Sequence, residues 1–376
     1  MTKTRQRLVL GAAAVLVAAA GIVLGVVATR TPPVCTGVPA FTSGTATAPS
    51  VYNETGKTIT LTTCPEVLRN LSDVIVNGGT WVDPNKDPGR PYGGTTAHGR
   101  AGVQVIGGTG ITLENMTMRG ADSTGNYIFK LAFNAGIEIE GTQGVTLTND
   151  TVSHVFGDCL ELAPLRGPPD GEGGIIGAVA GVTASNLNLS ACGRQGISPI
   201  NVRKATFTGI TVGRAGFDSM DDEADQSHGE GAKAIVFNAP CTFAGAISVS
   251  SGGESSGPIT FNGCTINETQ DGGEALYVKN LDGSPPAGPI TFSNTQIRCG
   301  ASAYVPCLNV TTGGDIILEN SALRIGNPSE PAIRERAYRL GGTSTLTIVN
   351  TTVRGIYNPG IADAQSTVTG ALVPPK

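Results

Sequence analysis

A short pattern of apolar and polar positions repeats along most of the chain. Two apolar residues stand two apart, an Asn or Gly follows the second of them by two positions, and another apolar residue follows three positions later. The pattern occurs as VIVNGGTW from Val74, ITLENMTM from Ile111, VTLTNDTV from Val145, VTASNLNL from Val182, ATFTGITV from Ala205, ITFNGCTI from Ile259, ITFSNTQI from Ile290, IILENSAL from Ile316 and LTIVNTTV from Leu346. Repeats of this length are typical of a solenoid in which each repeat is one coil.

Each alternating segment predicts a short strand with one buried face. The Asn or Gly predicts a tight turn whose residue adopts a positive φ. Strands this short bury their edges if equivalent strands of successive coils pair in parallel, about 4.8 Å apart, around one continuous core. Asn side chains at one register position would then form a ladder. We therefore predict an all-β parallel β-helix, rather than a sandwich or a propeller, in which Ile111, Val145, Val182 and Ala205 line one wall of the core.

Composition agrees with many short strands and turns. The 376 residues include 53 Gly and 23 Pro, with 5% aromatic and 15% charged residues. The net charge of -5 gives no basic surface, so we expect no nucleic-acid partner. A polysaccharide remains a suitable partner, and we expect a monomer.

The first residues predict export. Lys3, Arg5 and Arg7 precede about twenty apolar residues, which places the remainder outside the cytoplasm, secreted or at the cell surface. Residues 1–30 are either a cleaved signal peptide or an anchor, and only an uncleaved segment would contact the membrane. We assign residues 31–64 to a linker and cap, and residues 65–370 to the β-helix.

The eight cysteines fit an exported chain with disulfides, and no CxxC pair indicates zinc. Sequence proximity and the repeat register suggest four pairs: Cys35 with Cys64, Cys159 with Cys192, Cys241 with Cys264, and Cys299 with Cys307.

Residues 65–370 resemble the right-handed parallel β-helix proteins of the pectin-lyase-like superfamily, in which each coil contributes to one single-stranded solenoid. Within them, VTLTNDTVSHVFGDCLEL and CGRQGIS distantly resemble polygalacturonase-like glycoside hydrolases, which carry Gly-Asp-Asp-Cys and, a coil later, Gly-His-Gly-Ile. Asp158 falls on one family carboxylate, whereas the second Asp is absent and Gln195 replaces the His. The resemblance implies cleavage of a carbohydrate by paired acids.

An outward column of polar residues is predicted when four residue pairs are aligned at one position of successive coils: Gly136-Ile137, Cys159-Leu160, Gly196-Ile197 and Gly216-Phe217. The column comprises Gln104, Glu138, Glu161, Ser198 and Asp218. Asp158 and Gln195 stand just before it, and Arg194 and Arg214 would stack at the turn. A loop, APLRGPPDGEGG, would wall the groove beside this column.

Three carboxylates, Asp158, Glu161 and Asp218, are the candidate catalytic residues. Glu161 and Asp218 would lie about 9 to 10 Å apart, which overlaps the separation used by inverting glycosidases. The candidate substrate-binding residues are Arg194, Gln195, Arg214, Ser198, Glu138 and His154. Each set also has a structural interpretation, because outward charges are often a solvated face and Arg–carboxylate pairs often brace turns.

The acidic run FDSMDDEADQSHGE is either a solvated loop or a calcium site formed by Asp221, Asp222, Glu223 and Asp225. Apart from calcium, we expect no cofactor. Three functions stay open: a hydrolase acting on a polysaccharide, acidic sugars included; a uronate lyase or epimerase; and a non-catalytic β-helix that binds glycan.

Overall fold

The computed structural model forms two units, Met1–Pro33 and Val34–Lys376. It describes residues 41–61, 66–84, 102–122, 124–128, 134–166, 175–224, 231–268, 273–280, 284–300, 305–326, 335–355, 357–358, 360–362 and 364–373. The predicted export segment and the predicted Cys35–Cys64 pair lie outside these residues. Within the described ranges, no helix has the length and apolar character that crossing a membrane requires.

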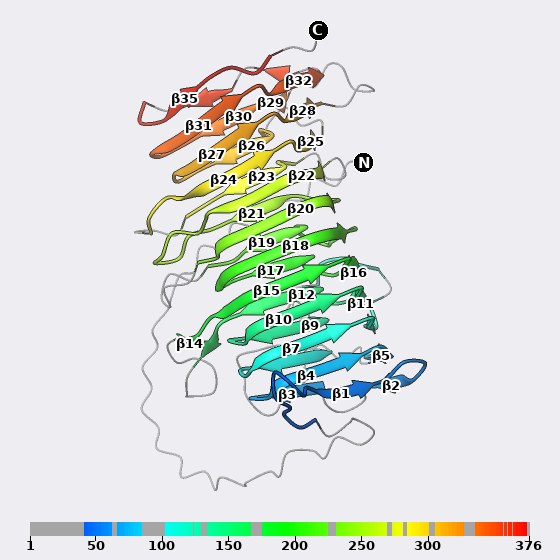
Figure 1. Ribbon diagram of the computed structural model, residues 1–376. Helices are drawn as coiled ribbons and strands as arrows, with labels where there is room; N and C mark the ends of the chain where they lie inside the picture. The colour runs from blue at the N-terminus through cyan, green and yellow to red at the C-terminus, as the bar shows by residue number, and fades with distance from the viewer. Residues whose placement is uncertain are drawn as a thin grey trace, which may run out of the picture. The chain divides into compact units, whose positions relative to one another are not determined.

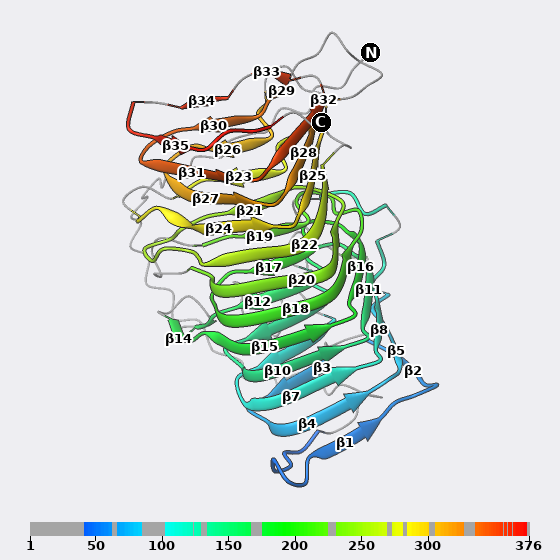
Figure 2. The ribbon, with the colours of Figure 1, turned by 45° about the horizontal axis from the view of Figure 1, so that its top comes forward.

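The second unit is a parallel β-helix, and the predicted fold class is confirmed (Figures 1 and 2). A typical coil contains β9 (Ile137–Glu140), β10 (Gln143–Thr148) and β11 (Thr151–Val155), and β12 (Leu160–Ala163) begins the next coil. Leu160 of β12 pairs in parallel with Ile137 of β9. Successive coils therefore stack strand on strand, as the repeats predict.

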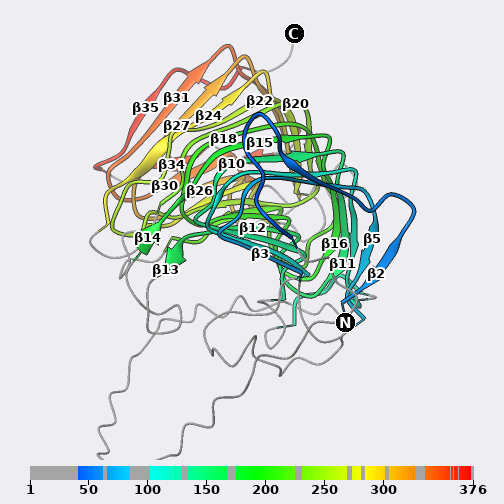
Figure 3. The ribbon, with the colours of Figure 1, turned by 60° about the horizontal axis from the view of Figure 1, so that its bottom comes forward.

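The strands form three walls around the core, which Figure 3 shows along the stack of coils. One wall is an 11-stranded sheet of β3 (Glu66–Arg69), β6 (Val103–Ile106), β9, β12, β17 (Ile197–Pro199), β19 (Met220–Asp222), β21 (Ile247–Val249), β23 (Leu276–Val278), β26 (Leu308–Val310), β30 (Tyr338–Leu340) and β34 (Ile361–Ala362). The other two walls belong to one 20-stranded sheet that bends at the Asn or Gly turn.

The 20-stranded sheet has its strands on both sides of that turn. Before or across the turn run β1 (Ser50–Asn53), β4 (Ser72–Asn77), β7 (Thr109–Glu114), β10, β15 (Val179–Ser185), β18 (Val202–Val212), β20 (Lys233–Phe243), β22 (Ile259–Glu268), β24 (Ala287–Ser293), β27 (Gly314–Glu319), β31 (Ser344–Val349) and β35 (Thr367–Thr369). After it run β2 (Thr58–Thr60), β5 (Thr80–Val82), β8 (Thr117–Arg119), β11, β16 (Asn188–Cys192), β25 (Gln296–Cys299), β28 (Ala322–Ile325) and β32 (Thr352–Gly355). The ladder thus starts at Ser50, inside the segment assigned to the linker and cap.

Two small sheets lie outside the walls. They are the antiparallel pair β13 (Leu165–Arg166) and β14 (Ile175–Gly177), and the parallel pair β29 (Glu335–Arg336) and β33 (Tyr357–Asn358). The first pair forms the base of the loop expected to wall the groove. The tip of that loop, 167–174, lies outside the described residues.

The turn residues behave as predicted. All nine Asn or Gly positions of the repeats have a positive φ: Gly78, Asn115, Asn149, Asn186, Gly209, Gly263, Asn294, Asn320 and Asn350. The expected side-chain ladder is present, because Asn149 Nδ2 donates to Asn115 Oδ1 at 3.1 Å and Asn186 Nδ2 donates to Asn149 Oδ1 at 3.0 Å.

One coil escaped the repeat pattern. Ile235 pairs with both Ala205 and Ile259, so IVFNAPCTF from Ile235 is a further repeat. Its turn holds Ala239 and Pro240 where the neighbouring coil has the single residue Gly209. Because of the extra residue and the missing Asn or Gly, this coil does not match the repeat pattern and was not predicted from the sequence.

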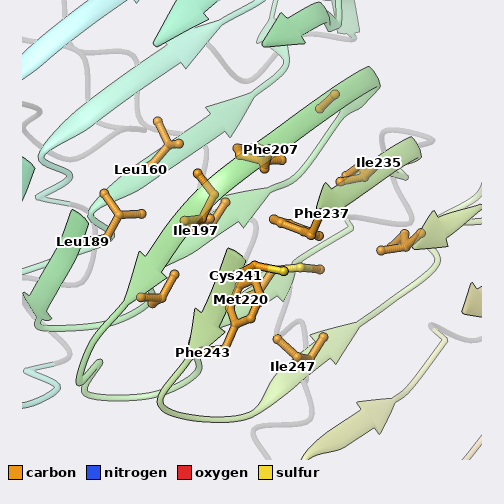
Figure 4. Close-up of a cluster of buried hydrophobic side chains, with 14 of the residues drawn as sticks. Leu160, Leu189, Ile197, Phe207, Met220, Ile235, Phe237, Cys241, Phe243 and Ile247 are labelled. Carbon is orange, nitrogen blue, oxygen red and sulfur yellow. The ribbon is translucent and has the colours of Figure 1, made fainter. Parts of the chain in front are cut away.

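The core is built from stacked apolar columns. Ile111, Val145, Val182 and Ala205 are buried in adjacent coils, which confirms the predicted wall. Further along, the rings of Phe207, Phe237, Phe261 and Phe292 stack in series with centroids 4.8 to 5.1 Å apart. Figure 4 shows two of these rings close to Leu160, Ile197, Met220 and Ile247 of the 11-stranded sheet.

Three predicted disulfides are confirmed. Cys159 bonds Cys192 and Cys241 bonds Cys264, and each pair joins neighbouring coils. Cys299 bonds Cys307. These bonds reinforce a stack whose coils are otherwise held by backbone hydrogen bonds and packing.

We expect Gly209→Val to destabilise the protein by roughly 1–3 kcal/mol, because a β-branched residue is strained at a φ of 71°. A Cβ here would also lie 2.5 Å from Asn186 Oδ1. Gly209→Asn is the matched control, since Asn adopts this conformation at equivalent turns and would extend the ladder. Urea denaturation measures both variants. Equal stabilities for the two would show that the turn conformation does not select its residue.

Candidate functional site

The outward residues of the 11-stranded sheet form a polar column across six coils. Glu138 pairs with both Gln104 and Glu161, and Glu161 pairs with Ser198. Ile197 pairs with Met220, so the next residues, Ser198 and Asp221, are also aligned. Asp221 in turn pairs with Ser248. The column is therefore Gln104, Glu138, Glu161, Ser198, Asp221 and Ser248.

Asp221, and not Asp218, occupies the predicted column. The alignment of Gly216-Phe217 with Gly196-Ile197 is wrong, because Phe217 lies opposite Arg194 and its side chain is 53% exposed. The Gly-apolar pair resembled the preceding coil by chance. The repeats that begin at Val182 and Ala205 are 23 residues apart. The same spacing places Met220 in the next coil at the position equivalent to Ile197, which is the observed register.

Asp218 belongs to a second column, with Asp158 and Gln195. The amide of Cys159 donates to Gln195 O, and that of Gly196 donates to Asp218 O. The two columns are separated by three residues along each coil, and together they bring five candidate carboxylates to one face: Glu138, Asp158, Glu161, Asp218 and Asp221. Ser248 Oγ donates to Asp218 Oδ2 at 2.7 Å. Sequence reasoning missed Ser248 because its coil lacks the Asn or Gly signal.

Gln195 ties the two columns together. Its backbone amide donates to Asp158 Oδ1 at 3.1 Å, and its side-chain Nε2 donates to Asp221 Oδ2. Ser198 Oγ donates to Gln195 Oε1 at 2.7 Å. Gln195 is fully buried, so these bonds hold its amide in one orientation. Gln195 thus orients two of the candidate carboxylates.

Arg194 supplies the positive charge of the cluster. Its guanidinium lies 3.3 Å from Asp158 Oδ2 and also pairs with Glu223. Asp158 is fully buried, whereas the Glu223 side chain is 41% exposed. Arg194 therefore balances the charge of carboxylates of its own protein. Together with Asp158 and Gln195 it forms a structural brace across the turn.

The predicted stack of Arg194 on Arg214 is wrong. Cys192 bridges Ala215, which places Arg214 opposite Ala191, three residues before Arg194. Arg214 is exposed and donates to Asn126 Oδ1 at 3.0 Å. His154 also lies outside the two columns, near the end of β11, where its carbonyl accepts a hydrogen bond from the amide of Asp122.

Burial shifts the carboxylates of the cluster toward their protonated forms. Burial and then the charge of Asp158 raise the pKa of Glu161 to about 8. Burial raises the pKa of Asp158 to about 6, with Arg194 opposing the rise. The pKa of Asp221 is raised by burial and by the charge of Asp218. The pKa of Glu138 is raised by burial and by the charge of Glu161, although Gln104 Nε2 donates to it at 2.9 Å. Glu161 is therefore a protonated acid at neutral pH.

The predicted calcium ligands do not converge. Asp221 points outward to Gln195, Glu223 pairs with Arg194, and Asp222 aligns with the core residue Val249. Asp222 is fully buried. Asp225 lies outside the described residues. Over the described ranges, no group of three His, Cys, Asp or Glu side chains has the arrangement of a metal site.

Comparison with known proteins shows only distant structural likeness. No protein-family model matches the chain, and no curated protein matches its sequence. Among solved structures, the Agl-KA catalytic domain is 12% identical with a TM-score of 0.48, over 85% of this chain and 61% of that one. The catalytic unit of the GH87 alpha-1,3-glucanase from Streptomyces thermodiastaticus strain HF3-3 is 12% identical with a TM-score of 0.49, over 89% and 68%.

The tailspike protein gp49 from Pseudomonas phage LKA1 is 13% identical with a TM-score of 0.42, over 81% of this chain and 49% of that one. The chain thus spans about half to two thirds of these proteins. Likeness at this level says nothing about substrate or reaction. The parallel β-helix is defined by the chain's own register, and the site by its two acidic columns.

Stability should fall as the pH rises from about 5 to about 8. Glu161 and Asp158 have a pKa above the ordinary value, so the folded chain keeps protons that the unfolded chain releases over this range. Each such group contributes up to about 1.4 kcal/mol per pH unit. Urea denaturation at several pH values measures the fall, and Glu161→Gln should reduce it.

Asp150 provides an internal control for this experiment. It lies outside the two columns, accepts the amide of Met116 at 2.8 Å, and burial raises its pKa to about 7. The contribution of Asp150 to the pH dependence of stability should persist in the Glu161→Gln variant. The fall in stability with rising pH should therefore become smaller in this variant but not disappear. A stability that is flat or rises between pH 5 and 8 would contradict the protonated cluster.

Proposed function

We propose that this chain is an extracytoplasmic carbohydrate-active protein that hydrolyses a polysaccharide at the two acidic columns. The observation that carries the proposal is Glu161, whose pKa burial raises to about 8, on the same face as the carboxyl group of Asp218 two coils away. Hydrolysis of a glycosidic bond needs such a pair, because one group must donate a proton while the other stays ionised. The disulfides support an oxidising, extracytoplasmic location.

Glu161 is assigned the role of general acid. Of the buried carboxylates in the two columns it has the largest exposed fraction, 9%, against 6% for Asp221 and 5% for Asp218. A sugar that reaches this face therefore meets Glu161 most readily. With a pKa of about 8, Glu161 holds a proton at neutral pH and can give it to the leaving oxygen.

The pair of Asp218 and Asp221 is assigned the role of general base. Burial and then the charge of Asp218 raise the pKa of Asp221, so the two aspartates titrate as one coupled pair in this scheme. Glu161 and Asp221 share a column two coils apart, about 9 to 10 Å between Cβ atoms. Carboxyl groups separated by roughly 6.5 to 9.5 Å leave room for a water in inverting glycosidases. We therefore expect inversion of the anomeric configuration.

Asp158, Arg194 and Gln195 are positioning residues in this scheme. Asp158 is fully buried and engaged by both Arg194 and the amide of Gln195, so it holds the brace and touches no substrate. Arg194 already pairs with two carboxylates, so its charge is balanced within the two columns and is not left for a uronate. A neutral polysaccharide fits this site better than an acidic one.

Two other functions remain as alternatives. A uronate lyase would need positive charge at the sugar carboxylate, and the Arg194–Arg214 fork that would supply it does not form. A non-catalytic glycan-binding β-helix is favoured by one observation: Gln195 and Ser248 satisfy Asp158, Asp218 and Asp221 with hydrogen bonds from within the protein. An assay of reducing ends and of absorbance at 235 nm separates these alternatives from hydrolysis.

We expect reducing ends to appear from a neutral polysaccharide, without the 235 nm absorbance of an unsaturated uronate. Glu161→Gln and Asp218→Asn should each lower kcat by about 100-fold or more, because each removes a proton-transfer group. The thermal midpoint of Glu161→Gln should stay close to that of the parent, since Gln replaces a protonated Glu. Glu319→Gln, at an exposed site on the 20-stranded sheet, is the control.

The outcomes are distinct. Absorbance at 235 nm would identify a lyase, and glycan binding without any product would identify a binding protein. A variant that loses stability while it keeps its turnover would show that the carboxylate is only a structural brace.

A further inference from the structure

An exposed pair of aromatic rings lies beside the acidic columns. The side chains of Tyr127 and Phe217 are 40% and 53% exposed, and their ring centroids are 5.6 Å apart with planes tilted by 43°. Among the residues whose side-chain exposure the structure describes, no other aromatic side chain is exposed. Because aromatic rings are usually buried, two in contact at the surface indicate a binding function.

The segment that carries Tyr127 is fixed to the coils. Asp122 Oδ1 accepts the amide of Thr124 at 2.8 Å, and its Oδ2 accepts the amide of Gly125 at 3.0 Å. Gly125 has a φ of 61°, and a Cβ there would lie 3.1 Å from Ala191 Cα. The segment therefore packs closely on the end of β16.

The turn that carries Phe217 is built to receive this segment. A Cβ on Gly216 would lie 2.5 Å from the backbone nitrogen of Tyr127, so only glycine allows the approach. Arg214 Nη2 donates to Asn126 Oδ1 at 3.0 Å and joins the two segments at their rim. The rings are thus held in position before any ligand arrives, which lowers the entropy lost on binding.

The pair adjoins the residues proposed to act in hydrolysis. Phe217 directly precedes Asp218, and its amide donates to the carbonyl of Arg194 at 2.8 Å. The rings therefore stand at the edge of the acidic columns.

We propose that Tyr127 and Phe217 form a stacking subsite for a sugar ring of a neutral polysaccharide, next to the acidic columns. A pyranose has a face of C–H groups that packs on aromatic rings, and hydroxyls at its edge. Arg214 and Asn126 stand at the rim, where the Arg guanidinium has donors beyond the one given to Asn126. This arrangement of apolar rings with a few placed polar groups is what a sugar site requires. The inference rests on the proposed function for its substrate class.

The test measures binding separately from turnover. Neutral hexaoses of glucose, mannose and xylose in different linkages are titrated into the full chain carrying Glu161→Gln, by calorimetry. In this background, Phe217→Ala and Tyr127→Ala should each weaken binding of the best hexaose by about tenfold. Phe217→Trp should retain binding, because it keeps an aromatic face. Ile176→Ala, at a side chain on β14 that is 66% exposed, should change nothing.

Turnover then distinguishes the two proposals. If the hexaose binds and the alanine variants weaken it, the subsite holds even where the parent chain gives no product, and only the proposed hydrolysis fails. If the parent chain cleaves a neutral glycan but Phe217→Ala and Tyr127→Ala leave KM and hexaose affinity unchanged, the subsite is overturned and the hydrolysis holds. Binding of none of the hexaoses overturns the subsite. Thermal midpoints of the variants show that each is folded.

Discussion

The parallel register between coils is the constraint on which the rest of the structure depends. Each strand of the 11-stranded sheet pairs with the equivalent strand of the next coil, about 4.8 Å away, and side chains alternate between the core and the outside. A slip of one residue would turn Glu161 inward and Leu160 outward. The Asn ladder and the Cys159–Cys192 bond fix the register on neighbouring walls. The position of every site residue follows from it.

The same register creates an electrostatic problem that the site resolves. Carboxyls stacked at one position in successive coils repel each other and lose solvation. The structure accommodates them in two ways: Glu161 and Glu138 are held toward their protonated forms, whereas Asp158 pairs with Arg194. Burial raises the pKa of both Glu161 and Asp158, but Arg194 opposes the rise at Asp158, so the two carboxyl environments differ in pKa, which acid–base chemistry requires. The hydrogen bonds of Gln195 to Asp158 and Asp221 hold the two columns in fixed positions relative to each other.

Much of the fold could be predicted from the sequence, because a solenoid repeats its local rules. The positive φ of Asn149, the burial of Val182 and the Cys241–Cys264 bond all follow from one repeat. The site was predicted less well. Two acidic residues three positions apart, Asp218 and Asp221, both suit an outward column, and the alignment of Gly216-Phe217 favoured the wrong one. The contact of Tyr127 with Phe217 depends on packing between segments ninety residues apart, for which no local pattern exists.

The central claim is that the two acidic columns of the 11-stranded sheet are the place where a glycan binds and is cleaved. A crystal structure of the Glu161→Gln variant with a bound neutral hexaose tests it most directly. The account predicts a glycosidic oxygen within hydrogen-bonding distance of residue 161, with Asp218 and Asp221 on the opposite side of that sugar and an adjoining ring against Tyr127 and Phe217. A hexaose bound instead to either wall of the 20-stranded sheet would contradict it.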